Sequence, residues 1–202
     1  MALRTRVKIN NITNLHDARY GAGMTVDLLG FSWKKDSMYV QNPDKLYEII
    51  QWITGPSFVA ELDENLLPIP SQYQNFFEYV QTDDETMLER ISSQYLKPII
   101  LEKTVALPAH LEYLAEIPLE NVEMLILKAS APLWNQAWKK SISDLACHIP
   151  ILLNFNYNAS QIAEITQEIP IVGFAIDGST EIRTGINEID RLAEILEILE
   201  EE

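Results

Sequence analysis

The stretch Val26–Trp33, which reads VDLLGFSW, is an almost continuous apolar run. Such a run is typical of a strand that is buried on both faces of a parallel sheet. Asn42 and Pro43 follow it and favour a helix start, because proline fits the first helical turn. Apolar residues at helical spacing come next, at Leu46, Ile49, Ile50 and Ile53. A buried strand followed by an amphipathic helix is therefore the repeating unit that the sequence predicts.

The same unit recurs on both sides of this stretch. Strands are predicted at 7–12, 26–33, 57–62, 76–81, 98–101, 122–127, 149–155 and 171–176. Helices are predicted after them, at 13–22, 42–53, 66–74, 84–95, 108–117, 133–147, 159–168 and 187–200. The helix at 66–74 must be short or broken, because it contains Pro68 and Pro70. Units of roughly 25 residues predict an α/β fold, a single (β/α)₈ barrel domain over 1–202, in preference to an open doubly wound sheet.

The composition narrows the classes of partner. Thirty Asp and Glu against fifteen Lys and Arg give a formal net charge of -15, which disfavours nucleic acid. The single cysteine, Cys147, excludes an intrachain disulfide and a cysteine-based metal site. No apolar run reaches the roughly 20 residues that span a bilayer, and no apolar segment follows the basic start Met1–Lys8. We expect a cytoplasmic protein without nucleic-acid or membrane partners, whose oligomeric state stays open.

Four motifs, in chain order and at matching spacing, resemble those of the phosphoribosylanthranilate isomerase family. The residues 8–18 (KINNITNLHDA) are similar to the family's K-I-C-G-I-T-N followed by D-A. Residues 29–31 (LGF) with 37–40 (SMYV) are similar to L-G-F…S-P-R-Y-V, and 80–85 (VQTDDE) to V-Q-L-H-G. Residues 175–181 (AIDGSTE), with Gly185, resemble D-V-S-S-G-V-E…P-G. The resemblance covers essentially the whole chain and implies a (β/α)₈ barrel of tryptophan biosynthesis.

The resemblance also implies two catalytic positions. The family rearranges an aminoaldose to an aminoketose, which needs a general base and a general acid. Asn10 stands where the family has its cysteine base, and Lys128 stands where it has its aspartate acid. An amide has no titratable proton near neutral pH, and a lysine differs from a carboxylic acid in charge and reach. The resemblance therefore predicts a barrel without the parent activity, that is, a pseudoenzyme.

The ligand-binding positions implied by the resemblance are altered as well. Met38 aligns with the arginine that meets the anthranilate carboxylate, and Phe155 and Asn156 align with paired glycines that approach the phosphate. Side chains at these glycine positions occupy space that a phosphate cradle needs. Hydrogen-bond donors remain available after the last strand, at Asp177, Gly178 and Ser179.

Other polar residues near predicted strand ends are further candidates. The amides of Asn10, Asn11, Asn154 and Asn156 lie where a barrel builds its site, and either bind a sugar-like or carboxylate ligand or satisfy one another. Lys103 and Lys128 either bind a phosphate or carboxylate, or supply a Schiff-base amine, or pair with nearby acids. Asp63, Asp83 and Asp177 could hold a divalent cation, but acids are so abundant that no metal and no cofactor is predicted.

Three functions follow in order of preference. The first is a degenerate barrel that binds a small phosphorylated, carboxylate or sugar-like ligand at the carboxyl ends of the strands, through Asp83 among the candidates above. The second is a working isomerase with substitute residues, and the third is a different, lysine-dependent enzyme on the same scaffold. A decisive observation is whether this end is open or filled by Trp33, Met38 and Phe155.

Overall fold

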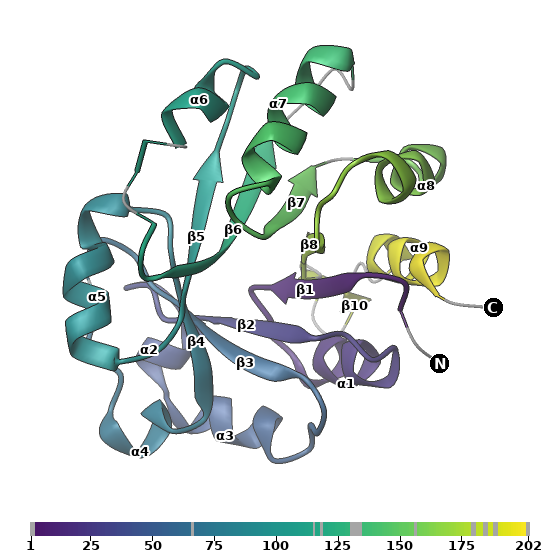
Figure 1. The fold of residues 1–202 in the computed structure, drawn as a ribbon. Coiled ribbons are helices and arrows are strands. Elements are labelled where there is room, and N and C mark those ends of the chain that lie inside the picture. Colours follow the sequence, from purple (N-terminus) through teal and green to yellow (C-terminus); the bar gives the residue numbers. More distant parts are fainter. Residues whose placement is uncertain are drawn as a thin grey trace.

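Eight parallel strands close into a barrel in the computed structural model, in the order β1-β2-β3-β4-β5-β6-β7-β8 (Figure 1). The structure describes residues 3–65, 67–114, 116–117, 119–129, 135–155, 157–178, 181–183, 186–187 and 190–200. The barrel strands are β1 (Arg6–Asn10), β2 (Leu28–Ser32), β3 (Ser57–Glu61), β4 (Phe77–Thr82), β5 (Ile99–Thr104), β6 (Val122–Ala129), β7 (Ile151–Phe155) and β8 (Gly173–Asp177). The predicted (β/α)₈ barrel is confirmed.

Helices connect successive strands and form the outer layer (Figure 1). They are α1 (Leu15–Gly23), α2 (Met38–Gln41), α3 (Asp44–Ile50), α4 (Ser71–Gln74), η1 (Glu85–Met87), α5 (Leu88–Tyr95), α6 (His110–Leu114), α7 (Gln136–Ala146), α8 (Ala159–Glu168) and α9 (Asp190–Leu199). Within the described part of the chain, none of these helices has the length and apolar character needed to cross a membrane.

Some element boundaries differ from the prediction. Strands β5 and β6 extend two or three residues further, because they pair with each other as far as Thr104 and Lys128. The short helix α2 and the two-stranded ladder of β9 (Glu181–Arg183) and β10 (Ile186–Asn187) were not predicted. The helix at 66–74 is reduced to α4, as its two prolines predict.

Asparagine side chains start three of the helices. Asn14 accepts a hydrogen bond from the Asp17 backbone N–H at 2.9 Å and so caps α1. Asn135 caps α7 in the same way, and Asn158 forms a reciprocal capping box with Gln161 at α8. These capping residues determine at which residue each of the three helices begins.

Alternation along each strand separates two apolar cores. Val7 and Ile9 of β1 point outward into the large core between strands and helices. A smaller core fills the inside of the barrel, and its buried members are Leu28, Val59, Ile100, Met124, Ile126, Leu152 and Ala175. The inward positions nearer the carboxyl ends of the strands are polar instead, from Asn10 on β1 to Asp177 on β8.

The barrel closes where β1 meets β8, in register from Arg6 opposite Gly173 to Asn10 opposite Asp177. A Cβ atom on Gly173 would lie 1.8 Å from the Arg6 carbonyl oxygen, so only glycine permits this approach. The described residues nearest the two termini lie side by side beyond this seam (Figure 1). There the Arg4 N–H donates to the Leu199 carbonyl at 2.9 Å, and Leu3 forms an antiparallel bridge with Glu200.

Candidate functional site

A polar cavity of about 280 Å³ opens at the carboxyl ends of the strands, and we call it the barrel mouth. It is lined by Asn10, Asn11, Ser32, Lys34, Glu61, Leu62, Gln81, Thr82, Asp83, Glu102, Lys128 and Asp177. These residues come from the ends of β1 to β6 and of β8 and from the loops that follow. This is the end at which (β/α)₈ enzymes build their sites, because the βα loops vary there without disturbing the barrel.

A buried ion pair lies beneath the mouth. The Lys8 ammonium is fully buried, and its Nζ lies 2.6 Å from Oε1 of Glu61, whose side chain is only 7% exposed. Lys8 also donates a hydrogen bond to Oδ1 of Asn10. Gly30 on the intervening strand makes room for the pair, since a Cβ there would lie 1.8 Å from Glu61 Oε1. The ion pair therefore depends on residues from three adjacent strands.

The backbone of Asn11 also donates a hydrogen bond to the Glu61 carboxylate. This N–H lies 3.2 Å from each carboxylate oxygen of Glu61. Asn11 has a φ of 51°, in the left-handed region that glycine and asparagine tolerate best. The similar family motif has glycine at this position, so the replacement by asparagine keeps the backbone turn.

Asp177 connects three side chains across the barrel seam. Its Oδ1 accepts hydrogen bonds from the amides of Asn10 and Asn154, both at 3.0 Å. Its Oδ2 lies 3.3 Å from Nζ of Lys128. Burial opposes ionisation of this carboxyl, but the hydrogen bond from Asn10 and the charge of Lys128 outweigh it and lower the pKa of Asp177. The carboxylate is thus held ionised at the rim.

The pKa of Glu102 is shifted in the opposite direction from that of Asp177. Glu102 lies on the inward face of β5 and accepts a hydrogen bond from Nε2 of Gln81 at 3.1 Å. Burial, with the nearby charges of Glu61 and Asp177, raises its pKa, although Lys128 and Lys8 oppose the rise. Two carboxyl groups in one cavity are therefore shifted in opposite directions, as occurs in sites that bind or transfer protons.

A second hollow of about 620 Å³ adjoins the mouth and shares Asn11, Ser32 and Lys34 with it. The first residue of α2, Met38, lines this hollow together with Asp63. Asp83 stays on the mouth side, where its Oδ2 lies 3.5 Å from Nζ of Lys34. Met38 and Asp83 are thus close to the cavity, as expected from their positions.

Two predicted residues point away from the mouth. Lys103 lies on the outer face of β5, where it pairs with Glu85 and donates to the Asp83 carbonyl at 3.2 Å. Phe155 is buried against α7, with its ring centroid 5.7 Å from that of Trp138. The expectation that both face the site is corrected by strand alternation, because each follows an inward-facing residue.

Of the remaining predicted site residues, the structure describes some and leaves others undescribed. Gly178 lies at the seam, where its N–H donates to the Asn10 carbonyl at 2.8 Å and a Cβ would approach that oxygen to 2.9 Å. Asn156 and Ser179 lie outside the described residues. Trp33 is buried against Phe77, at 6.3 Å between ring centroids. Neither Trp33 nor Phe155 fills the mouth, which is open.

Several residues were missed from the sequence, namely Lys8 beneath the mouth and Lys34, Glu61, Gln81 and Glu102 in its lining. For Glu61, Gln81 and Glu102 the signal was strand alternation, which places these polar residues at inward positions near the carboxyl ends of β3, β4 and β5. Among the described residues, no group of three or more His, Cys, Asp or Glu is placed to hold a metal ion. The mouth is instead a network of carboxylates, amides and lysines that suits hydrogen bonding to a small polar molecule.

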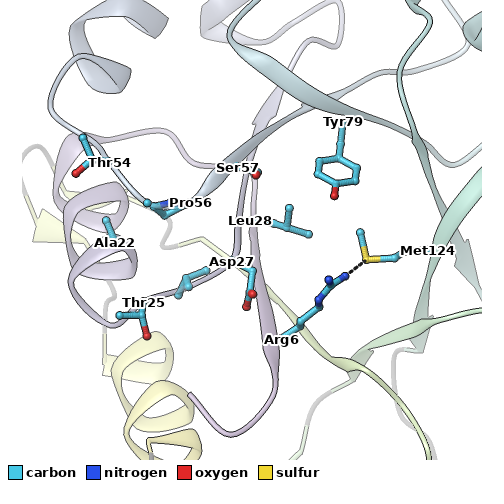
Figure 2. Close-up of a pocket in the computed structure, with 12 residues that line it drawn as sticks. Arg6, Ala22, Thr25, Asp27, Leu28, Thr54, Pro56, Ser57, Tyr79 and Met124 are labelled. Carbon is cyan, nitrogen blue, oxygen red and sulfur yellow. Dashed lines mark hydrogen bonds between the residues drawn. The ribbon is translucent and has the colours of Figure 1, made fainter. Parts of the chain in front are cut away.

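The opposite end of the barrel holds a separate pocket of about 480 Å³ (Figure 2). Arg6 and Asp27 are its charged lining residues, among apolar ones such as Leu28 and Met124. The Arg6 guanidinium contacts the Met124 sulfur at 3.7 Å, and the Asp27 carboxylate accepts from the Val7 backbone N–H at 2.9 Å. At this end of (β/α)₈ barrels, side chains generally contribute to stability, whereas active sites lie at the other end.

Comparison with known proteins bears on the fold. No protein family model and no curated protein sequence matches the chain. Among solved structures, the N-(5'-phosphoribosyl)anthranilate isomerase of Pyrococcus furiosus is similar at 17% identity with a TM-score of 0.66. The phosphoribosyl anthranilate isomerase of Thermus thermophilus is similar at 20% identity with a TM-score of 0.67. Each match covers 96% of this chain and 98% of the other.

A third similar structure is a phosphoribosyl anthranilate isomerase in complex with reduced 1-(o-carboxyphenylamino)-1-deoxyribulose 5-phosphate. This structure matches with 16% identity and a TM-score of 0.71. It covers 96% of this chain and 98% of that one. Identities this low establish the fold and leave the activity open. The resemblance predicted from the motifs is thus confirmed in three dimensions: the chain has, over 96% of its length, the (β/α)₈ barrel of the phosphoribosylanthranilate isomerase structures.

Proposed function

We propose that this chain binds a small, sugar-like molecule in the barrel mouth and does not isomerise phosphoribosylanthranilate. The observation that carries the proposal is that the Asn10 amide is hydrogen-bonded at both its oxygen and its nitrogen. Its Oδ1 accepts from the buried Lys8 ammonium, and its Nδ2 donates to Asp177 at 3.0 Å. A neutral amide held on both sides cannot take a proton from a sugar carbon, which is the step that the family assigns to this position.

The position of the general acid supports the same proposal. Lys128 faces the mouth, but its ammonium is paired with Asp177 at 3.3 Å. An ammonium in this setting donates hydrogen bonds to a hydroxyl group, which favours binding. The family's phosphate-binding glycine is replaced by Phe155, whose side chain is packed against Trp138. Base, acid and phosphate position are therefore all changed together.

The lining of the mouth favours hydroxyl groups on the ligand. This lining contains both amides and carboxylates, among them Asn10 and Asp177 on one side and Gln81 and Glu102 on another. A hydroxyl both donates and accepts, so a polyhydroxylated molecule can satisfy such a lining at many points. A volume of about 280 Å³ is at the small end for ligand sites and suits a single sugar ring.

The catalytic half of the proposal is tested with phosphoribosylanthranilate and an active isomerase as positive control. We expect no turnover above the uncatalysed rate, and no growth of a tryptophan auxotroph that lacks its isomerase. Turnover at an enzymatic rate that Lys128→Ala abolishes would establish a working isomerase with substitute residues instead.

The binding half is tested by ligand-detected NMR with D-ribose and D-glucose. We expect saturable binding that Asp177→Leu weakens about tenfold or more, because Asp177 links three side chains of the mouth. Arg6→Met, at the opposite end of the barrel, is the control and should leave binding unchanged. Equal binding by both variants would contradict a site in the mouth.

A further inference from the structure

We propose that the ligand of the barrel mouth carries a positively charged amino group, which is bound by Glu102 and Gln81. This inference rests on the proposed function above and names the chemical class of the ligand. It departs from the expectation of a phosphorylated or carboxylate ligand, and two independent observations carry it.

The first observation is the distribution of charge. Each lysine in the lining of the mouth, and Lys8 beneath it, already has a carboxylate partner. These pairs are Lys8 with Glu61 at 2.6 Å, Lys34 with Asp83 at 3.5 Å, and Lys128 with Asp177 at 3.3 Å. Glu102 lines the same cavity and, among the residues that the structure describes, forms no ion pair. The mouth thus has one carboxylate in excess and no lysine to spare for an anion.

The second observation is an acceptor without a donor. Gln81 is 6% exposed and lines the cavity, and its Nε2 donates to Glu102. Its Oε1 is buried and has no hydrogen-bond partner in the described part of the chain. Buried polar atoms are almost always paired, so such an atom at a cavity indicates a missing donor. An ammonium group carries three donors and no acceptor, and it can serve Gln81 and Glu102 together.

The overall charge acts in the same direction. A net charge of -15 attracts cations and repels phosphorylated molecules, and the excess carboxylate in the lining of the mouth has the same sign. A hydroxylated primary amine, such as an amino sugar, combines the positive charge with the hydroxyl groups that the rest of the lining favours.

The experiment compares three probes with one ring skeleton: D-glucosamine, D-glucose and D-glucose 6-phosphate. Affinities are measured by ligand-detected NMR at neutral pH. We expect D-glucosamine to bind about tenfold more tightly than D-glucose, and D-glucose 6-phosphate to bind most weakly. In Glu102→Gln, D-glucosamine and D-glucose should bind with about equal affinity, because the substitution removes the charge of the side chain and keeps its shape.

Glu123→Gln is the matched control. It changes the net charge by the same amount, but Glu123 lies at the opposite end of β6, where its carboxylate accepts a hydrogen bond from Tyr79. The preference for D-glucosamine should survive in this variant. Gln81→Met is a second test and should weaken D-glucosamine binding more than D-glucose binding. Melting temperatures of all variants verify that they are folded.

The outcomes separate this inference from the proposed function. Equal affinity for D-glucose and D-glucosamine, or a preference that survives Glu102→Gln, would overturn the amine assignment and leave the sugar site in place. Tightest binding of D-glucose 6-phosphate would overturn it in favour of an anion site. Failure of all three probes would overturn both proposals.

Discussion

The two ends of the barrel are made from the same eight strands, but different groups fill them. At the mouth, inward-facing side chains such as Asp177 and Glu102 form a hydrogen-bonded network of ionisable and amide groups. At the opposite end, the apolar side chains of Leu28 and Met124 line the pocket, and the Arg6 guanidinium contacts the Met124 sulfur (Figure 2). Polar groups placed inside a barrel disfavour folding unless they are paired, so their accumulation at one end indicates a role in binding.

The largest effect should come from breaking the buried ion pair under the mouth. Lys8→Met leaves the Glu61 carboxylate nearly buried without its cation, and we expect a loss of about 3–5 kcal/mol in the free energy of unfolding. Urea denaturation measures this loss. The double variant Lys8→Met with Glu61→Leu should recover most of it, because no unpaired charge remains. A single variant as stable as the wild type would show that the pair is not buried in solution.

Glycine substitutions compare steric tolerance at the two ends. We expect Gly30→Ala at the mouth and Gly173→Ala at the opposite end each to cost about 1–3 kcal/mol. Gly173→Ala should cost more, because its Cβ would lie 1.8 Å from a backbone oxygen, whereas that of Gly30 meets a side chain. The control is Gly23→Ala in α1, where a Cβ meets nothing within 4 Å. Thermal and urea unfolding rank the three, and an equal loss in Gly23→Ala would contradict the steric argument.

The pH dependence of stability should separate the two shifted carboxyls of the mouth. Because the pKa of Glu102 is raised above its ordinary 4.5, its contribution is present below that pH and is lost as pH rises through the raised pKa. Glu102→Gln should therefore be more stable than the wild type at neutral pH and equal to it near pH 4. Burial is the main cause of the raised pKa, which Glu61 and Asp177 increase and Lys128 and Lys8 reduce. Gln81 also faces this carboxyl, as a hydrogen-bond donor.

Asp177 should behave in the opposite way. Its pKa is lowered from an ordinary 3.8, so its contribution is present above that pH and is lost as pH falls through the lowered pKa. Asp177→Asn should be less stable at neutral pH, by less than about 1 kcal/mol because its side chain is 55% exposed. Urea midpoints from pH 2 to pH 8 test both variants, and parallel curves for the two would refute the assignment.

The smallest effect is expected at the end without a network. Arg6→Met should change the free energy of unfolding by no more than about 0.5 kcal/mol. The exposed guanidinium contacts the Met124 sulfur and, among the described residues, forms no ion pair. Urea unfolding measures the change. A loss comparable to that of Lys8→Met would show that the two ends contribute alike.

Most of the fold could be predicted from the sequence, because local patterns determine it. The apolar run at 26–33 and its seven counterparts each became a strand, and the prolines at 68 and 70 shortened their helix as expected. The ends of β5 and β6 could not be predicted, because they depend on mutual pairing as far as Thr104 and Lys128. Pairing partners are set by the closed sheet and not by the local sequence.

The mouth was predicted in part, for a similar reason. Asn10, Lys128 and Asp177 are polar residues at strand ends, and the structure brings them together. Lys103 was placed by its nearness to a strand end, and Phe155 by the resemblance to the family's paired glycines. The alternation of inward and outward positions instead turns both side chains toward the helix layer. Lys8 was missed because its burial requires Glu61, a partner 53 residues away in the chain.

The absence of a side chain at Gly30 restricts how this barrel can be altered. Lys8, Gly30 and Glu61 stand on three neighbouring strands, where the glycine leaves the space that the ion pair of the other two occupies. A single replacement at any of them yields either an unpaired charge or a steric overlap. Single substitutions at these three positions therefore destabilise the protein, and this part of the barrel changes only through less stable intermediates. Residues of the surrounding loops can be substituted one at a time.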